Sequence, residues 1–428
     1  MTRQSSLPRS FWILWTATTA TNLGDGIRLV ALPLLATQLT RDAGLIALVT
    51  VFTYLPALLV GPIAGVFVDR ARKRGLIAGA HIARAAVLAL VTVLTWQGSL
   101  TIPALCVAAF LYGVGEAVGD PAAHAILPRL VSTSDLGQAN SRLQSGMIMG
   151  EMFVGRAAGG VLFAVASFWP VLANMLLLAA AAAIVLGLRV DEPSRARSAA
   201  RRNRLAEFRH ELLEGLTVVV HSRLLGRMSI LLAVWAGVSG AFWGIATIYA
   251  LRDLHSGATG YGVMLALSAL GSLAGATVAI RFVRALGAAR ATAVAVIISA
   301  ASIAALALTT DSWLAALLLA FNGFAVTIWN VMSVTVRQAT VEPALLGRVS
   351  SMYRILATLA MPLGAGLAGL LASDVGATPV FAVVAAVLAL AGAIIIPGLW
   401  PILEKSWPRG QSSAESLGGV EAPMRVDT

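Results

Sequence analysis

Long apolar runs separated by short polar breaks make up most of this 428-residue chain. A run of about 20 apolar residues crosses the hydrocarbon layer as a helix, and only helices or closed barrels satisfy every backbone group in lipid. The runs lack the alternation of a strand. We therefore predict an all-α membrane protein with twelve spans, at about 11–37, 45–68, 75–97, 100–123, 143–167, 170–190, 227–251, 260–282, 290–310, 312–336, 351–373 and 378–400.

One long polar break divides the spans into two sets of six. It begins with Asp191-Glu192-Pro193, continues through several arginines, and ends where Leu205, Phe208 and Leu212 recur at helical spacing. That spacing predicts an amphipathic helix. The predicted domains are a six-helix bundle at 1–190, a cytoplasmic linker with an amphipathic helix at 191–226, a second bundle at 227–400, and a disordered cytoplasmic tail at 401–428.

The two halves share a weak repeat at an offset of 210 residues. Gly61 to Gly65 recurs as Gly271 to Gly275, Leu136-Gly137 recurs as Leu346-Gly347, and Gly159 matches Gly369. Parallel repeats of this kind are typical of secondary transporters. The sequence therefore predicts two pseudo-symmetric six-helix bundles.

Composition and charge agree with a membrane location. Hydrophobic residues make up 58% of the chain and charged residues 12%, against about 25% charge in soluble domains. The net charge is +11, but its cations gather on one side of the predicted topology, while the opposite loops hold little more than Arg41 and Arg252. This positive-inside bias predicts a multi-pass cell-membrane protein with both termini in the cytoplasm, embedded in the lipid bilayer and without a nucleic-acid partner.

Few residues suggest enzyme chemistry. Cys106 is the single cysteine, so an internal disulfide or cysteine cluster is excluded. The sequence lacks a phosphate-binding loop of the G-x-x-x-x-G-K-[ST] type, an H-E-x-x-H metal motif and a G-x-S-x-G nucleophile motif. We predict no enzyme activity, no cofactor and no metal site.

Several spans carry ionisable side chains, which are costly in a membrane and usually functional. Burial raises the pKa of a carboxyl and a nearby guanidinium lowers it, so buried acids beside arginines can bind protons or a substrate. The alternative is that they form static ion pairs that fix helix register. The residues predicted to act in proton coupling or substrate binding are Asp25, Arg28, Arg84, Glu116, Glu151 and Arg156.

The segment from Gly65 to Arg74 reads Gly, three residues, Asp, a basic residue and a basic cluster. It resembles the signature loop after the second span of the major facilitator superfamily, although Arg72 stands where that family usually has glycine. The resemblance implies that Asp69 is a conformational latch, with Arg354 as a plausible partner; the cations also serve as a topology signal. Asp120, followed by Pro121, is expected to end span four and join this gate. The predicted cytoplasmic gate comprises Gly65, Asp69, Arg70, Lys73, Arg74, Asp120 and Arg354.

Span five resembles the family's antiporter motif, Gly-Pro-x-x-Gly-Gly. Here it reads Gly155-Arg156-Ala157-Ala158-Gly159-Gly160, so an arginine replaces the proline. Small residues at this spacing let helices approach closely. Loops near 120–140 and 347–364 are similar to the superfamily's drug:proton antiporter branch, which includes macrolide and enterobactin exporters.

These features together predict a monomeric secondary transporter that exports a small organic molecule, such as a drug, siderophore or secondary metabolite, in exchange for protons by alternating access. Proton-coupled uptake by the same fold is the main alternative, and a non-transporting receptor or scaffold is a third possibility. Bulky side chains within the spans could line a cavity for the solute. The predicted lining residues are Trp15, Phe242, Trp243, Trp329 and Asn330.

Overall fold

The structure is a computed structural model that describes residues 7–61, 64, 68, 71–132, 135–188 and 204–406. Within those ranges the ordered elements are helices and there is no strand. The α-helices are α1 (Arg9–Leu39), α2 (Ala43–Leu59), α4 (Lys73–Trp96), α5 (Ile102–Ile126), α6 (Leu136–Met147), α7 (Arg156–Val165), α8 (Trp169–Leu186), α9 (Arg204–His221), α10 (Arg223–Ile248), α11 (Gly257–Leu286), α12 (Ala288–Leu306), α13 (Ser312–Thr340), α14 (Pro343–Val375) and α15 (Ala377–Ser406). Two π-helical segments, η3 (Ile148–Gly155) and η4 (Tyr249–Asp253), and a 3₁₀ turn, η1 (Leu127–Arg129), complete them.

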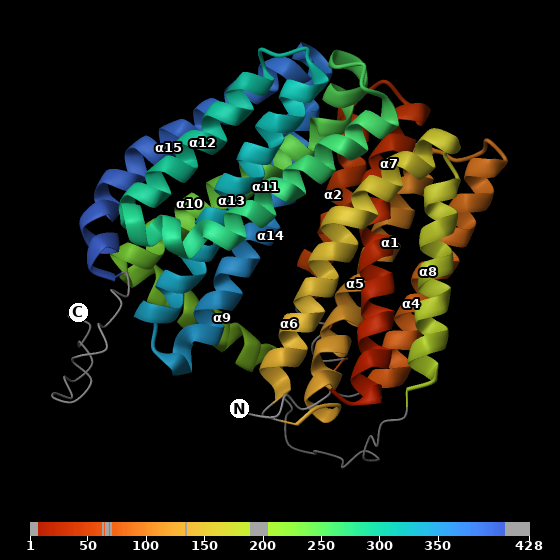
Figure 1. Ribbon diagram of the computed structural model, residues 1–428, viewed down its shortest axis with the longest axis horizontal. Coiled ribbons are helices and arrows are strands. Elements are labelled where there is room, and N and C mark those ends of the chain that lie inside the picture. Colours follow the sequence, from red (N-terminus) through yellow and green to blue (C-terminus); the bar gives the residue numbers. More distant parts are fainter. Residues whose placement is uncertain are drawn as a thin grey trace.

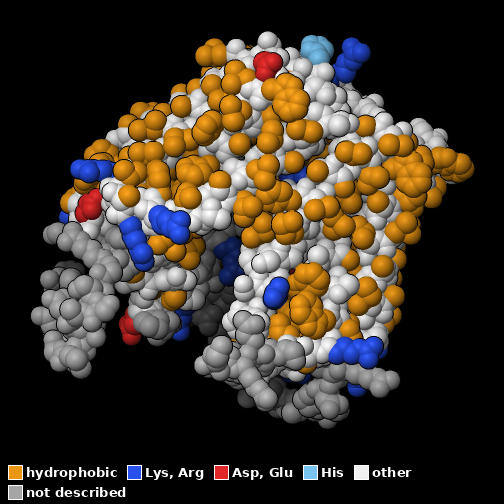
Figure 2. Space-filling view, in the orientation of Figure 1, with side chains coloured by type: hydrophobic (Ala, Val, Ile, Leu, Met, Phe, Trp, Pro, Cys, Tyr) orange, Lys and Arg blue, Asp and Glu red, His pale blue; other side chains and the backbone are white. Residues whose placement is uncertain are grey.

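The predicted membrane helices are present. Ten helical segments are long and apolar enough to cross a bilayer. The other two predicted spans correspond to α1, which carries Asp25 and Arg28 in its middle, and to α2, whose continuous helix has 17 residues. The all-α membrane architecture is confirmed, and apolar side chains cover much of both bundles on the face that Figure 2 shows.

The helices form two bundles of six spans, one from α1 to α8 and one from α10 to α15 (Figure 1). Across the interface, α7 packs against α11 and α14 packs against α2. In chain order, span five packs on span eight, and span eleven packs on span two. A parallel repeat relates these two contacts, because spans two and five of the first half correspond to spans eight and eleven of the second. The repeat inferred from glycine and leucine positions therefore corresponds to a real pseudo-symmetry.

The bundles meet at one end and separate at the other (Figure 1). A hollow lies between them at the end where α1 begins, α15 ends and α9 crosses (Figures 1 and 2). At the opposite end the Arg252 guanidinium donates to the Arg41 carbonyl oxygen at 2.7 Å, joining the two halves. The open end is the one that the charge bias predicts to be cytoplasmic.

One sequence expectation about helix ends is wrong. Pro121 does not end span four, because α5 continues through it to Ile126. A proline inside a membrane helix is tolerated when neighbouring helices and local adjustments satisfy the freed backbone groups.

The linker contains a helix, α9, that packs against α14 and α10. Glu214 accepts a hydrogen bond from Arg348 at 2.8 Å, and the α9 backbone at Gly215 lies close to the Arg348 carbonyl. The linker helix therefore docks on the C-terminal bundle.

Candidate functional site

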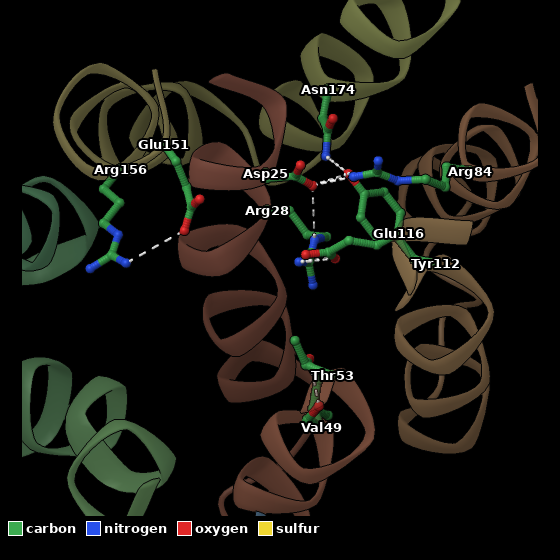
Figure 3. A network of polar contacts seen from close by, with 10 residues as sticks. All are labelled: Asp25, Arg28, Val49, Thr53, Arg84, Tyr112, Glu116, Glu151, Arg156 and Asn174. Carbon is green, nitrogen blue, oxygen red and sulfur yellow. Dashed lines mark hydrogen bonds and ion pairs between the residues drawn. The ribbon is translucent and has the colours of Figure 1, made fainter. Parts of the chain in front are cut away.

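A cluster of polar side chains lies inside the N-terminal bundle, where α1 passes between its neighbours (Figure 3). Asp25, 5% exposed, pairs with Arg84 of α4, which is fully buried. The Tyr112 hydroxyl of α5 donates to Asp25 at 2.6 Å and accepts from Arg84 at 2.7 Å and from the Asn174 amide of α8 at 3.2 Å. One hydroxyl thus connects three helices around a single carboxylate.

Glycines explain why the helices can approach at this point. Asp25 is flanked by Gly24 and Gly26. A methyl group on Gly24 would lie 2.9 Å from the Asn174 amide carbon, and one on Gly26 would lie 2.9 Å from the Gly155 backbone. The Gly-Asp-Gly sequence therefore lets α8 and η3 pack on both sides of the buried acid.

A second ion pair lies next to the first. Arg28, 4% exposed, donates to Glu116 of α5 at 3.1 Å and lies 3.8 Å from Asp25. The Arg28 and Arg84 guanidinium carbons lie 4.4 and 4.2 Å from the Tyr112 ring centroid, within the range of a cation–π contact. The Glu116 side chain is 36% exposed, whereas the Asp25 side chain is 8% exposed and remains enclosed.

A third pair, Glu151 and Arg156, stands apart from the Asp25 cluster (Figure 3). Glu151 belongs to the π-helical segment η3, and Arg156 begins α7. Their closest atoms, Glu151 Oε1 and Arg156 Nη2, are 3.9 Å apart, which is beyond hydrogen-bond distance. The Arg156 guanidinium also lies 5.7 Å from the Trp243 ring centroid in the C-terminal bundle. Arg156 therefore contacts both halves of the molecule.

Two cavities adjoin at Arg156 and Trp243. The first, of about 140 Å³, lies between the bundles and is lined by Arg28, Leu29, Leu32, Pro33, Thr50, Thr53, Tyr54, Arg156, Trp243, Tyr261, Leu265 and Met361. The second, of about 120 Å³, lies mainly within the C-terminal bundle and is lined by Met152, Arg156, Trp235, Val238, Ser239, Phe242, Trp243, Ser268, Ala269, Ser272, Ile303, Asn322, Gly323 and Val326. Arg156 and Trp243 are the residues common to both.

The structure thus brings all six predicted coupling residues together near the centre of the molecule. Asp25 with Arg84, Arg28 with Glu116, and Glu151 with Arg156 form three acid–arginine pairs. Their role in transport stays a prediction, because the pairing is compatible with both proton coupling and helix register.

Only some of the predicted gate residues lie in the part of the chain that the structure describes. Gly65, Asp69 and Arg70 lie outside the described residues. Lys73 is buried at the start of α4, and Arg74 donates to the Leu186 carbonyl at the end of α8. Asp120 and Arg354 are exposed on α5 and α14. The latch between Asp69 and Arg354 stays a prediction.

The aromatic residues have different surroundings. Phe242 and Trp243 line the second cavity, and their contact with a solute stays a prediction. Trp15 instead donates to the Arg142 carbonyl of α6 at 2.9 Å, and Trp329 is buried behind Trp235, on which it stacks at 5.6 Å. Asn330 is exposed and lines neither of the two cavities.

Two residues at the centre of the cluster, Tyr112 and Asn174, were not predicted from the sequence. Tyr112 precedes Glu116 by four residues and therefore shares its helix face. Asn174 is the one polar side chain in α8. An isolated amide in an apolar span, and a tyrosine in register with a buried acid, were the available signals.

Comparison with known proteins agrees with this architecture. The model of a family described as "Transmembrane secretion effector" matches residues 7–411. The chain belongs to this family of the major facilitator superfamily. Members of this superfamily are transporters and not enzymes.

Among relatives, an uncharacterised transporter of the superfamily, y4rN of Sinorhizobium fredii, is 26% identical over 92% of this chain and 96% of its own length. Macrolide efflux protein A of Streptococcus pyogenes is 24% identical over 34% of this chain and 36% of its own. Among solved structures, a bacterial homologue of the iron transporter ferroportin in an inward-facing state has a TM-score of 0.72 at 16% identity, covering 92% of this chain and all of its own. This secretion-effector chain is therefore a multi-pass membrane transporter with the major facilitator fold.

Proposed function

We propose that this protein exports a small organic molecule from the cytoplasm in exchange for protons, by alternating access of a central site. The observation that carries the proposal is a set of three acid–arginine pairs beside the cavity between the halves, which Arg28 and Arg156 line. The pairs are Asp25–Arg84, Arg28–Glu116 and Glu151–Arg156. Ionisable groups at membrane depth that face a bundle interior commonly mark proton or substrate pathways.

The exposure of the acids supports a proton path. Glu116 and Glu151 side chains are 36% and 24% exposed, whereas that of Asp25 is 8% exposed. Protons from the hollow would reach Glu116 and Glu151 directly. Asp25 would respond to the protonation of Glu116, because Arg28 contacts both carboxylates. Since protonation of an acid weakens its ion pair, it changes how tightly α1 is held to α4 and α5.

Export is favoured over uptake by the family description and by the partial similarity to a macrolide efflux protein. The predicted topology places the open end of the hollow, both termini and α9 in the cytoplasm of the cell, facing the solute to be removed. Uptake coupled to the same acids is the second candidate.

The test is accumulation of a compound panel in a bacterial host that lacks its own exporters, with and without a proton uncoupler. Wild type should lower the accumulation of at least one compound, and the uncoupler should abolish the difference. Asp25→Asn should also abolish it, because the buried acid can no longer exchange a proton. Asp42→Asn is the matched control, since Asp42 caps α2 through its side-chain oxygen and asparagine caps equally well.

Accumulation that rises with expression would indicate uptake. Export that is identical in wild type and Asp25→Asn and insensitive to the uncoupler would refute proton coupling.

A further inference from the structure

We propose that the cavity within the C-terminal bundle binds a small, uncharged, ring-containing solute with hydrogen-bonding groups, and that this solute competes with the Arg156 guanidinium for the face of Trp243. The inference rests on the proposed transport function and names its substrate class. In this proposal, protons bind in the N-terminal bundle and the solute binds in the C-terminal bundle.

The chemistry of the cavity points to an uncharged ligand. Three aromatic side chains line it together with neutral polar groups, and Arg156 is the one charged residue among the lining residues. The acids of α10–α15 in the described part of the chain lie at the ends of their helices, at Asp253, Asp311, Glu342, Asp374 and Glu404. A cationic solute would therefore lose its hydration without gaining a counter-ion. An anion would have to compete with Glu151, which already lies near Arg156.

The cavity also offers directional hydrogen bonds. The Ser299 hydroxyl, fully buried, donates to the side-chain oxygen of Asn322 at 2.6 Å. This contact leaves the Asn322 amide nitrogen as a donor, and we find no partner for it among the described residues. Ser239 and Ser268 line the same cavity. Trp235, Phe242 and Trp243 can stack on a ring held by these groups.

The volume sets the size of the ring. The cavity holds about 120 Å³. An engineered apolar cavity of about 150 Å³ binds benzene, so one six-membered ring matches this space. Larger solutes would extend past Arg156 and Trp243 into the adjoining cavity of about 140 Å³.

Arg156 can connect this cavity to the acids because its guanidinium lies between two partners. It is 3.9 Å from Glu151 and 5.7 Å from the Trp243 ring centroid, and neither contact is at its optimum. A solute ring over Trp243 takes the place of the guanidinium and moves it towards Glu151. The closer cation favours the ionised carboxylate, so the proton of Glu151 leaves to the water of the hollow.

The reverse step follows from the same geometry. Protonation of Glu151 releases Arg156 to cover Trp243, which closes the solute site. Other charges near Glu151 on the helices packed against η3 are Asp25 and Arg28 of α1, and Glu116 lies beyond them on α5. Asp25, Arg28 and Glu116 are paired within the N-terminal bundle and do not line the solute cavity, whereas Arg156 lines it and lies beside Trp243. Arg156 is therefore the charge that responds to the solute. Solute and proton then exclude one another, as exchange requires.

Three probes of the same size and shape test the class of ligand: 4-hydroxybenzamide, which is neutral, 4-hydroxybenzamidine, a cation, and 4-hydroxybenzoate, an anion. Binding to the purified full-length protein is measured by saturation-transfer NMR, and proton release is measured with a pH dye in weak buffer. The neutral probe should bind about tenfold more tightly than either ion. It should release protons from wild type, and Glu151→Gln should bind it without proton release.

Variants locate the site. Trp243→Leu and Asn322→Ala should each weaken binding of the neutral probe about tenfold, whereas Trp243→Phe, which keeps a ring, should weaken it less. Trp313→Leu is the matched control, because Trp313 is 73% exposed on the outside of α13. Melting temperatures of the purified variants show that each remains folded.

Tighter binding of the cation or the anion would overturn the inference, as would unchanged binding in Trp243→Leu or binding without proton release. The inference would also be overturned if the neutral probe showed no binding at concentrations of tens of millimolar. Uncoupler-sensitive export in the accumulation assay would still support the proposed function in each of those cases. Absence of such export would refute the function itself.

Discussion

The Tyr112 hydroxyl shows how much one polar atom decides inside a membrane bundle. It contacts Asp25, Arg84 and Asn174 at once, and each of these is less than a tenth exposed. The sequence predicted Asp25 and Arg84 as functional because a charge in an apolar span is costly. It did not predict the hydroxyl, since a tyrosine in a span is common and its partners come from three other helices, α1, α4 and α8.

Replacing Tyr112 with phenylalanine should therefore destabilise the protein. Three buried groups lose a hydrogen-bond partner, at a cost of about 1–3 kcal/mol for a group left unsatisfied. The melting temperature of the purified protein should fall, and transport should fall with it. Tyr54→Phe is the control: Tyr54 lines the cavity between the bundles, and we find no hydrogen bond of its hydroxyl among the described residues. Equal melting temperatures for the two variants would contradict the central role of Tyr112.

Glycines at the points where helices cross set how closely the helices of the N-terminal bundle approach one another. Gly155 lies in the π-helical segment η3, directly against Gly26 of α1. The close approach expected from the glycine-rich motif is thus confirmed, with Gly159 against α1 and Gly160 against Gly262 of α11. The π-helical turns were not predicted, because hydrophobic periodicity does not distinguish a few π turns from α turns within one span. π-Helical turns are frequent at functional sites, and this one carries Glu151.

Gly155→Ala should disrupt this crossing. The added methyl group would lie 2.6 Å from the Leu23 carbonyl oxygen and 2.8 Å from the Gly26 backbone, and backbone atoms cannot move aside easily. We expect a loss of about 1–3 kcal/mol in stability, measured by thermal unfolding. Gly79→Ala in α4 has open space around it and should leave stability unchanged or raise it by about 0.5–1 kcal/mol. A stable Gly155→Ala protein with normal transport would contradict the packing argument.

At the scale of the whole molecule, the two bundles are held together at one end by the packing of α14 on α2 and of α11 on α7. Gly160 packs on Gly262, and Gly369 packs on Gly44 and Ala47, so each interface pair of the pseudo-symmetry has a close glycine contact. Arg252 adds hydrogen bonds to the Arg41 and Thr40 carbonyl oxygens at the end of α1, at 2.7 and 3.5 Å. Opening this end requires all of these contacts to separate.

Arg252→Ala should therefore favour opening towards the outside. In a Cys106→Ala background, a cysteine introduced by Leu265→Cys faces the cavity between the bundles, where Leu265 is 3% exposed. Its labelling by a membrane-impermeant maleimide added outside the cell should be about fivefold faster with Arg252→Ala, as expected for the loss of about 1 kcal/mol of hydrogen bonding. Arg41→Ala removes a neighbouring charge but keeps the carbonyl acceptor, and should not change the rate. Equal rates in all variants would show that Arg252 does not hold this end closed.

The sequence alone determined the number and approximate positions of the spans, their division into two related halves and the acids and arginines inside them. These properties are local, because lipid forces each helix to be long, apolar and internally hydrogen-bonded wherever it crosses. Only the tertiary structure decided that Asp25 pairs with Arg84, that Arg156 lies between Glu151 and Trp243, and that Trp329 lies behind the cavity rather than in it. Such pairings depend on the rotation and crossing of helices, which are set by glycine contacts between segments far apart in the chain.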